Sequence, residues 1–148
     1  MMLKQFLPKS RIQIVEKADS WQEAVKLCAK PLLDEGMIEP RYVDKIFQLY
    51  EDIGPYFVIA PKIAMPHARP EDGVIATGLS LLVVSSGVNF HSEDNDPVSL
   101  IIMLAAKDNT EHLSALASLA EMLGDDENVE RLVNATTTDE IFTFIQNQ

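Results

Sequence analysis

Two continuous apolar runs constrain the fold of this chain more than any other feature. They read "GLSLLVVSSGV" at residues 78–88 and "PVSLIIMLAAK" at residues 97–107. A strand with one face in water alternates between apolar and polar residues, whereas an unbroken apolar run is typical of a strand buried on both faces. Such strands need a sheet that is covered by helices on each side. The two runs therefore predict an α/β fold.

Helix-like patterns lie before and after these runs. The first helix begins with the capping-box pair Ser20 and Glu23 and ends near Gly36, and Pro31 predicts a kink or a break within it. Further helices are predicted at residues 39–54, 109–124, 127–135 and 137–148, and shorter strands at residues 11–15, 56–60 and 62–65. This order predicts one domain, residues 1–148, folded as a three-layer α/β sandwich with a mixed, mostly parallel sheet flanked by helices.

The composition and the charge limit the classes of protein to which this chain can belong. With 148 residues, of which 47% are hydrophobic, it can bury a core without disulfides, and we expect its single cysteine, Cys28, in or near that core. The spacing of cysteine and histidine gives no zinc site, so no metal or cofactor is predicted. A net charge of −11 disfavours nucleic-acid binding. The absence of a membrane-span pattern and of a signal-peptide pattern predicts a cytoplasmic protein.

The stretch "IAPKIAMPHARPEDGV" places a histidine between two prolines. Proline cannot donate to a sheet ladder, so Pro66 marks the end of a strand and His67 is expected just beyond its carboxyl end. Pro70 biases Arg69 toward an extended conformation, in which residues two apart point the same way. An imidazole beside a guanidinium suits a phosphate group. The alternative is a surface histidine near an unrelated arginine.

A second histidine follows the strand predicted at residues 98–106. His112 falls in the first turn of the next helix, where backbone N–H groups favour an anion. If the strands before the two histidines are parallel, His67 and His112 lie on one edge of the sheet, where ligands bind in open α/β sheets. The alternative is a solvated first-turn residue. His91 lies in an acidic loop and is interpreted as solvated.

Two blocks of the sequence resemble a known family. The stretch "GPYFVIAPKIAMPHARPEDGV" resembles the active-site signature of the mannitol/fructose-type enzyme IIA (EIIA type 2) domains of the bacterial phosphoenolpyruvate-dependent sugar phosphotransferase system (PTS). The stretch "DNDPVSLIIMLAAKDNTEHLSALASLAEML" matches the region in which that family carries a second histidine before an amphipathic helix. The tokens "GPYFVIAP", "PHARPEDGV" and "DNDPV" are most similar to the ascorbate-specific branch.

The resemblance implies a mechanism and a set of partners. His67 would accept a phosphoryl group from the phosphocarrier protein HPr and pass it to a cysteine of a separate EIIB, which serves the membrane permease EIIC. His112 would lie beside His67 and hydrogen-bond the phosphoryl group. The resemblance implies an enzyme of the phosphotransferase class that needs no metal, and it is compatible with a homodimer.

The sequence departs from the family pattern at one point, and two other functions remain open. Mannitol-type members carry an arginine upstream that helps to hold the phosphoryl group, but "QLYEDIGPYF" contains none. We therefore expect Arg69 to take over this task. One alternative function is a regulatory phosphorelay protein of the same fold, similar to the nitrogen-related branch. The other is a non-catalytic ligand-binding α/β domain.

Overall fold

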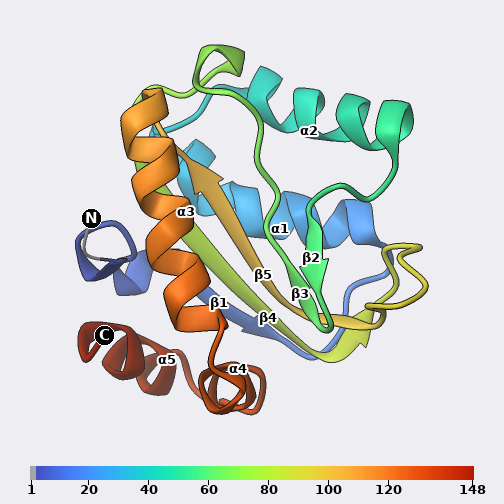
Figure 1. Cartoon of the computed structure of the whole chain (residues 1–148), viewed down its shortest axis with the longest axis vertical. Helices are drawn as coiled ribbons and strands as arrows, with labels where there is room; N and C mark the ends of the chain where they lie inside the picture. Colours follow the sequence, from blue (N-terminus) through green and yellow to red (C-terminus); the bar gives the residue numbers. More distant parts are fainter. Residues whose placement is uncertain (1–2) are drawn as a thin grey trace.

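A five-stranded mixed sheet forms the middle layer of the computed structural model, which describes residues 3–148 (Figure 1). Its order is β1-β4-β5-β3-β2. The strands are β1 (Ile12–Val15), β2 (Val58–Ala60), β3 (Ile63–Ala64), β4 (Gly78–Val88) and β5 (Val98–Ala105). The β1/β4 and β3/β5 pairs are parallel. The β2/β3 and β4/β5 pairs are antiparallel, since each joins consecutive strands through a short connection.

Helices cover both faces of the sheet, which confirms the predicted α/β sandwich (Figure 1). One layer contains α1 and α2 and the other contains α3, α4 and α5, as the two hydrophobic clusters show. The helices are α1 (Trp21–Asp34), α2 (Pro40–Ile53), α3 (Asn109–Leu123), α4 (Asp126–Val133) and α5 (Thr138–Gln146). The described residues also form the short 3-10 helices η1 (Leu3–Gln5), η2 (Lys9–Arg11) and η3 (Pro70–Asp72). None of the helices within residues 3–148 combines the length and apolar character needed to cross a membrane.

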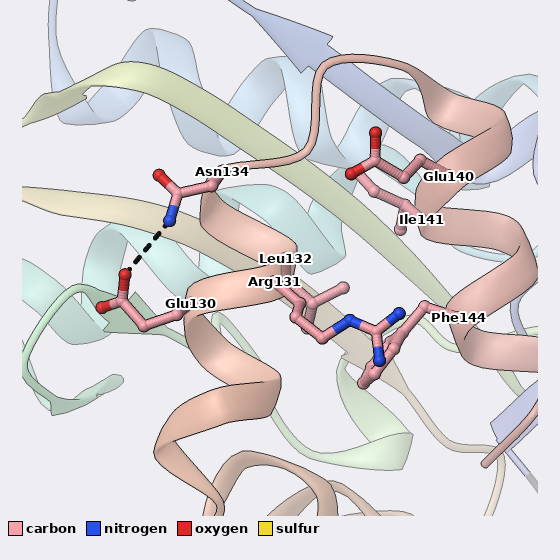
Figure 2. Close-up of a pocket in the computed structure, with 7 residues that line it drawn as sticks. All are labelled: Glu130, Arg131, Leu132, Asn134, Glu140, Ile141 and Phe144. Atoms are coloured by element: carbon pink, nitrogen blue, oxygen red, sulfur yellow. Dashed lines mark hydrogen bonds between the residues drawn. The ribbon is translucent and has the colours of Figure 1, made fainter.

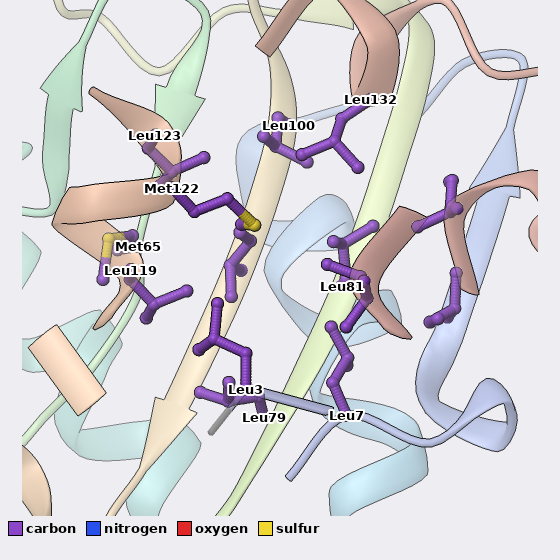
Figure 3. Packing of buried hydrophobic residues seen from close by; sticks show 14 of the residues in the cluster. Leu3, Leu7, Met65, Leu79, Leu81, Leu100, Leu119, Met122, Leu123 and Leu132 are labelled. Atoms are coloured by element: carbon purple, nitrogen blue, oxygen red, sulfur yellow. The ribbon is translucent and has the colours of Figure 1, made fainter. Parts of the chain in front are cut away.

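The apolar runs are buried on both faces, as their composition predicts. Along β4, Leu79 and Leu81 join the hydrophobic cluster under α3, α4 and α5, whereas Leu82 and Val84 join the cluster under α1 and α2. Figure 3 shows the first of these clusters, in which Leu100 of β5 lies among leucines from several elements. Because side chains alternate along a strand, one strand supplies both cores. Both faces of the sheet are thus covered by apolar layers. A functional site is therefore expected at an edge of the sheet and not on a face.

Local caps fix the helix ends, and a long-range contact corrects one expectation. The side chain of Ser20 accepts from the N–H of Glu23, as the capping pattern predicts. Of the kink or break predicted at Pro31, a break does not occur: α1 continues through this residue as one helix. Proline removes the donor that would reach the carbonyl of Leu27, four residues earlier. The Nε2 of Gln13, in β1, donates to that carbonyl at 2.7 Å instead.

Candidate functional site

Two histidines meet at one edge of the sheet. The strands β3 and β5 are parallel, with Ile63 opposite Leu100, so their carboxyl ends lie on the same side. His67 comes three residues after β3, and His112 is the fourth residue of α3, which follows β5. The centroids of the two imidazole rings are 5.5 Å apart and their planes are inclined by 59°. The structure thus brings together the two histidines that the sequence placed on a common edge.

The ring of His67 has a defined proton position. Its Nδ1 lies 2.7 Å from the backbone carbonyl of Met65. A carbonyl oxygen can only accept a hydrogen bond, so Nδ1 carries a proton, and in the neutral form of the ring the free lone pair is on Nε2. The segment itself is tied to the sheet beyond the end of β3, because the N–H of Leu104 donates to the carbonyl of Pro66 at 3.2 Å. The side chain that emerges is a partly buried imidazole whose Nε2 is the nitrogen not engaged by the backbone.

Two tyrosines bind the backbone next to this imidazole. The hydroxyl of Tyr56 donates to the carbonyl of His67 at 2.5 Å, and the N–H of Ala68 donates to the hydroxyl of Tyr42 at 3.0 Å. Tyr42 is fully buried, and its hydroxyl donates to the carbonyl of Leu104 at 2.6 Å. The sequence did not reveal these residues as part of the site. Tyr42 lies 25 residues before His67, and no short motif connects them.

His112 is placed by a regular helix start. The helix α3 begins at Asn109, as predicted, and the side chain of Asp108 caps it by accepting from the N–H of Glu111 at 2.8 Å. Burial is the main cause that lowers the pKa of His112 below 6.5, and the charge of the neighbouring His67 lowers it further. His112 is therefore mainly neutral at pH 7. A neutral imidazole can donate one N–H to an anionic oxygen.

Arg69 has the backbone conformation that the sequence predicts. Its φ of −81° and ψ of 156° are extended, and its N–H donates to the carboxylate of Asp72 at 2.9 Å. The side chain is exposed, whereas Ala68 before it is buried. No carboxylate within residues 3–148 forms an ion pair with its guanidinium. That Arg69 and His67 bind one common phosphate stays a prediction.

The other candidate residues lie elsewhere. His91 is exposed in the loop between β4 and β5, as expected. Cys28 is fully buried, and burial raises the pKa of its thiol to about 12, so it is a core residue. Within residues 3–148 there is no group of three or more histidine, cysteine, aspartate or glutamate side chains placed to hold a metal ion.

The hollow drawn in Figure 2 is also separate from the histidines. It has a volume of about 300 Å³ and lies between α4 and α5. Its walls include Glu130, Arg131 and Phe144, and the guanidinium of Arg131 lies 5.0 Å from the centre of the Phe144 ring. None of the residues that line it belongs to the β3–β5 edge.

Comparison with known proteins gives a consistent result. Residues 5–148 match the sequence model of the family described as phosphoenolpyruvate-dependent sugar phosphotransferase system, EIIA 2. The ascorbate-specific PTS system EIIA component of Escherichia coli (strain K12) is 40% identical over 147 residues, which cover 98% of this chain and 96% of that protein.

Two solved structures from Escherichia coli have the same fold. The mannitol-specific cryptic phosphotransferase enzyme IIA has a TM-score of 0.93 at 36% identity and covers 100% of both chains. The enzyme IIA from a complex with phosphorylated enzyme IIB of the mannitol system has a TM-score of 0.81 at 30% identity, over 94% of this chain and 96% of that one. Because the matches extend along nearly the whole chain, the protein belongs to the EIIA type 2 family of the phosphoenolpyruvate-dependent sugar phosphotransferase system, whose EIIA components are phosphotransferases.

Proposed function

We propose that this protein accepts a phosphoryl group from phospho-HPr on Nε2 of His67 and passes it to a cysteine of a cognate EIIB. The observation that carries the proposal is the contact between Nδ1 of His67 and the carbonyl of Met65, with His112 5.5 Å away between ring centres. Because this contact keeps a proton on Nδ1, Nε2 is the nitrogen that acts as the nucleophile in the neutral ring. It therefore meets the first requirement of a phosphohistidine intermediate.

The transfer needs little covalent machinery. The lone pair of Nε2 forms a new N–P bond as the N–P bond in HPr breaks, so no proton has to leave His67 before the attack. The ring then carries more positive charge, and the hydrogen bond from Nδ1 to Met65 becomes charge-assisted and stronger. In the second step a cysteine thiolate of EIIB forms an S–P bond, and the electrons of the N–P bond return to Nε2. Positioning and charge stabilisation supply most of the catalysis in such transfers.

His112, the N-terminus of α3 and Arg69 would stabilise the phosphoryl oxygens. His112 is neutral because its pKa is lowered, so it can donate an N–H without repelling His67. It stands in the first turn of α3, where the helix dipole favours an anion. Arg69 would supply the positive charge, since its exposed guanidinium has no carboxylate partner among residues 3–148. The proposed transfer uses no metal and no cofactor.

We place the protein in the cytoplasm, in a pathway for the uptake of ascorbate. It would pass the phosphoryl group to EIIB, which serves the membrane permease EIIC. The support for this pathway is the 40% identity to an ascorbate-specific component, together with the tokens "GPYFVIAP", "PHARPEDGV" and "DNDPV". The complex of a related enzyme IIA with phosphorylated enzyme IIB supports EIIB as the acceptor. All the groups named in the transfer come from one chain, so the proposal does not require a homodimer.

Labelling with phosphate tests the function. The protein is incubated with phosphoenolpyruvate, enzyme I and HPr, and acid-labile phosphate is measured. We expect labelling of the wild type and of the control His91→Ala, and none of His67→Ala. Labelling that survived in His67→Ala would contradict the proposal. Nitrogen-phosphorus coupling in the phosphorylated protein should identify Nε2. Addition of ascorbate-type and mannitol-type EIIB proteins then identifies the acceptor, because only the cognate one should remove the label rapidly.

A further inference from the structure

The peptide bond between His67 and Ala68 is bound at both of its polar ends by side chains. Its carbonyl accepts from the hydroxyl of Tyr56 at 2.5 Å, and its N–H donates to the hydroxyl of Tyr42 at 3.0 Å. Tyr42 comes from α2, whereas Tyr56 lies in the connection that precedes β2. Neither bond belongs to a sheet ladder or a helix. Two distant parts of the chain thus fix the plane of the one peptide that follows the imidazole.

We propose that Tyr42 and Tyr56 form a clamp on the His67–Ala68 peptide that sets the direction of the His67 imidazole. They would be positioning residues for the transfer, since they act through the backbone of His67. The inference rests on the proposed function of His67 and goes beyond it, because it assigns a role to two residues that do not contact the phosphoryl group.

The Tyr42 hydroxyl connects the two histidine segments. It accepts from Ala68 and donates to the carbonyl of Leu104 at 2.6 Å. Leu104 is the penultimate residue of β5, the strand that leads to α3 and His112. One buried hydroxyl therefore ties the peptide after the first histidine to the strand before the second. This tie helps to fix the 5.5 Å separation of the two imidazole rings.

Tyr56 limits the motion of the ring as well as of the backbone. Its phenol ring meets the His67 imidazole edge-on, with centroids 5.7 Å apart and planes at 73°. Burial raises the pKa of both phenols, that of Tyr42 to about 12, so both hydroxyls keep their protons at neutral pH. Tyr56 can then donate to the carbonyl continuously. A change of pH in the physiological range therefore does not remove the donors of the clamp.

The clamp and the proton position of His67 depend on each other. The bond from Nδ1 to the carbonyl of Met65 spans only two residues, with Pro66 between them. It forms only if the backbone of His67 is held at one angle to Met65. If either tyrosine bond is lost, the segment can rotate, and Nε2 no longer points steadily toward the incoming phosphorus. Misplacement by about 1 Å can cost up to about a hundredfold in rate.

Phenylalanine substitutions test the clamp, because they remove a hydroxyl and keep the ring. The variants are Tyr42→Phe and Tyr56→Phe. The matched control is Tyr50→Phe, which also lies on α2 and donates to a backbone carbonyl, that of Phe90 at 2.7 Å, outside the His67–Ala68 peptide. We expect the rate of phosphoryl acceptance from phospho-HPr to fall about tenfold in each clamp variant, with the KM for HPr nearly unchanged. The control should stay within about twofold of the wild type.

A spectroscopic readout separates positioning from loss of fold and from failure of the proposed function. Nitrogen-15 shifts of the unphosphorylated His67 ring report which nitrogen carries the proton, and they need no HPr. In the wild type the proton should reside on Nδ1, and in the clamp variants both tautomers should be populated. An unchanged transfer rate together with an unchanged tautomer in folded Tyr56→Phe would overturn the clamp. If Tyr42→Phe does not fold, Tyr56→Phe decides alone. If the wild type takes no phosphate, the proposed function fails, whereas the tautomer still tests the clamp.

Discussion

His67 and His112 reach the same edge of the sheet but are held in different ways. His112 lies on a regular helix, and the cap that starts this helix comes from Asp108, four residues away. His67 lies outside every helix and strand, and the peptide bond between it and Ala68 is held by the hydroxyl groups of Tyr42 and Tyr56. The first arrangement is local in the sequence and the second is long-range. The nucleophile thus depends on the assembled fold, whereas its neighbour depends mainly on one helix.

Removal of the helix-held histidine should slow the transfer without stopping it. A hydrogen bond to a charged group is worth about 1.5–3 kcal/mol, so His112→Ala should reduce the rate of transfer from phospho-HPr by about 10- to 100-fold. His67 would still become labelled. His112→Gln keeps an N–H donor and should recover part of the rate. Equal rates in His112→Ala and the wild type, measured by rapid quench, would show that this histidine makes no contact with the phosphoryl group.

The same local and long-range distinction decides how much of the site the sequence can predict. The start of α3 was predictable because its cap and its apolar spacing lie within a few residues of His112. The end of the strand before His67 was also predictable, since Pro66 marks it. The two tyrosine bonds were not, because they form only when α2, which carries Tyr42, and the connection before β2, which carries Tyr56, fold next to the His67–Ala68 peptide. No spacing rule relates residues that far apart.

The fold shows the same limit at two other positions. Pro31 does not break α1, because Gln13 from β1 donates to the carbonyl that the proline leaves without a partner. Arg11 lies in a segment that reads as a strand, yet its guanidinium is buried and bonds to Leu79, Phe6 and Glu35. Both outcomes depend on partners from other elements. The three layers, by contrast, were predictable from the apolar runs and the helix patterns before and after them.

Substitution of Arg69 tests whether the segment that carries the nucleophile His67 also supplies a positive charge. An exposed charge contact is worth up to about 1 kcal/mol, so Arg69→Ala should reduce the rate of phosphoryl acceptance by about two- to fivefold. Arg69→Lys keeps the charge and should lose less. The matched control is Arg131→Ala, on α4 beside Phe144. If Arg69→Ala accepted and transferred phosphate at the wild-type rate, the cation would have to come from elsewhere.

The helix that carries His112 can be compared with a remote helix, because both begin with an aspartate cap. Asp108 caps α3 and Asp125 caps α4, each through its carboxylate and a backbone N–H. Loss of a cap costs about 1 kcal/mol, so Asp108→Ala and Asp125→Ala should reduce the free energy of unfolding by similar amounts. Urea unfolding measures this. Only Asp108→Ala should shift the imidazole resonances of His112. A shift of equal size in Asp125→Ala would mean that the position of His112 depends on the whole helical layer.

The smallest expected effect concerns the proton on His112. Burial first and the charge of His67 second lower the pKa of His112 in the folded protein below 6.5. Between that lowered pKa and 6.5 the unfolded chain binds more protons, so the free energy of unfolding falls as the pH drops through this window and is constant below it. His112→Gln should remove this part of the pH dependence. His67→Ala removes only the second cause, so the pKa of His112, followed by proton NMR, should rise in that variant and stay below 6.5. A pKa above the pH of the transfer assay in the wild type would mean that His112 is mainly charged there, and the helix-held histidine would then act as a cation and not as a neutral donor.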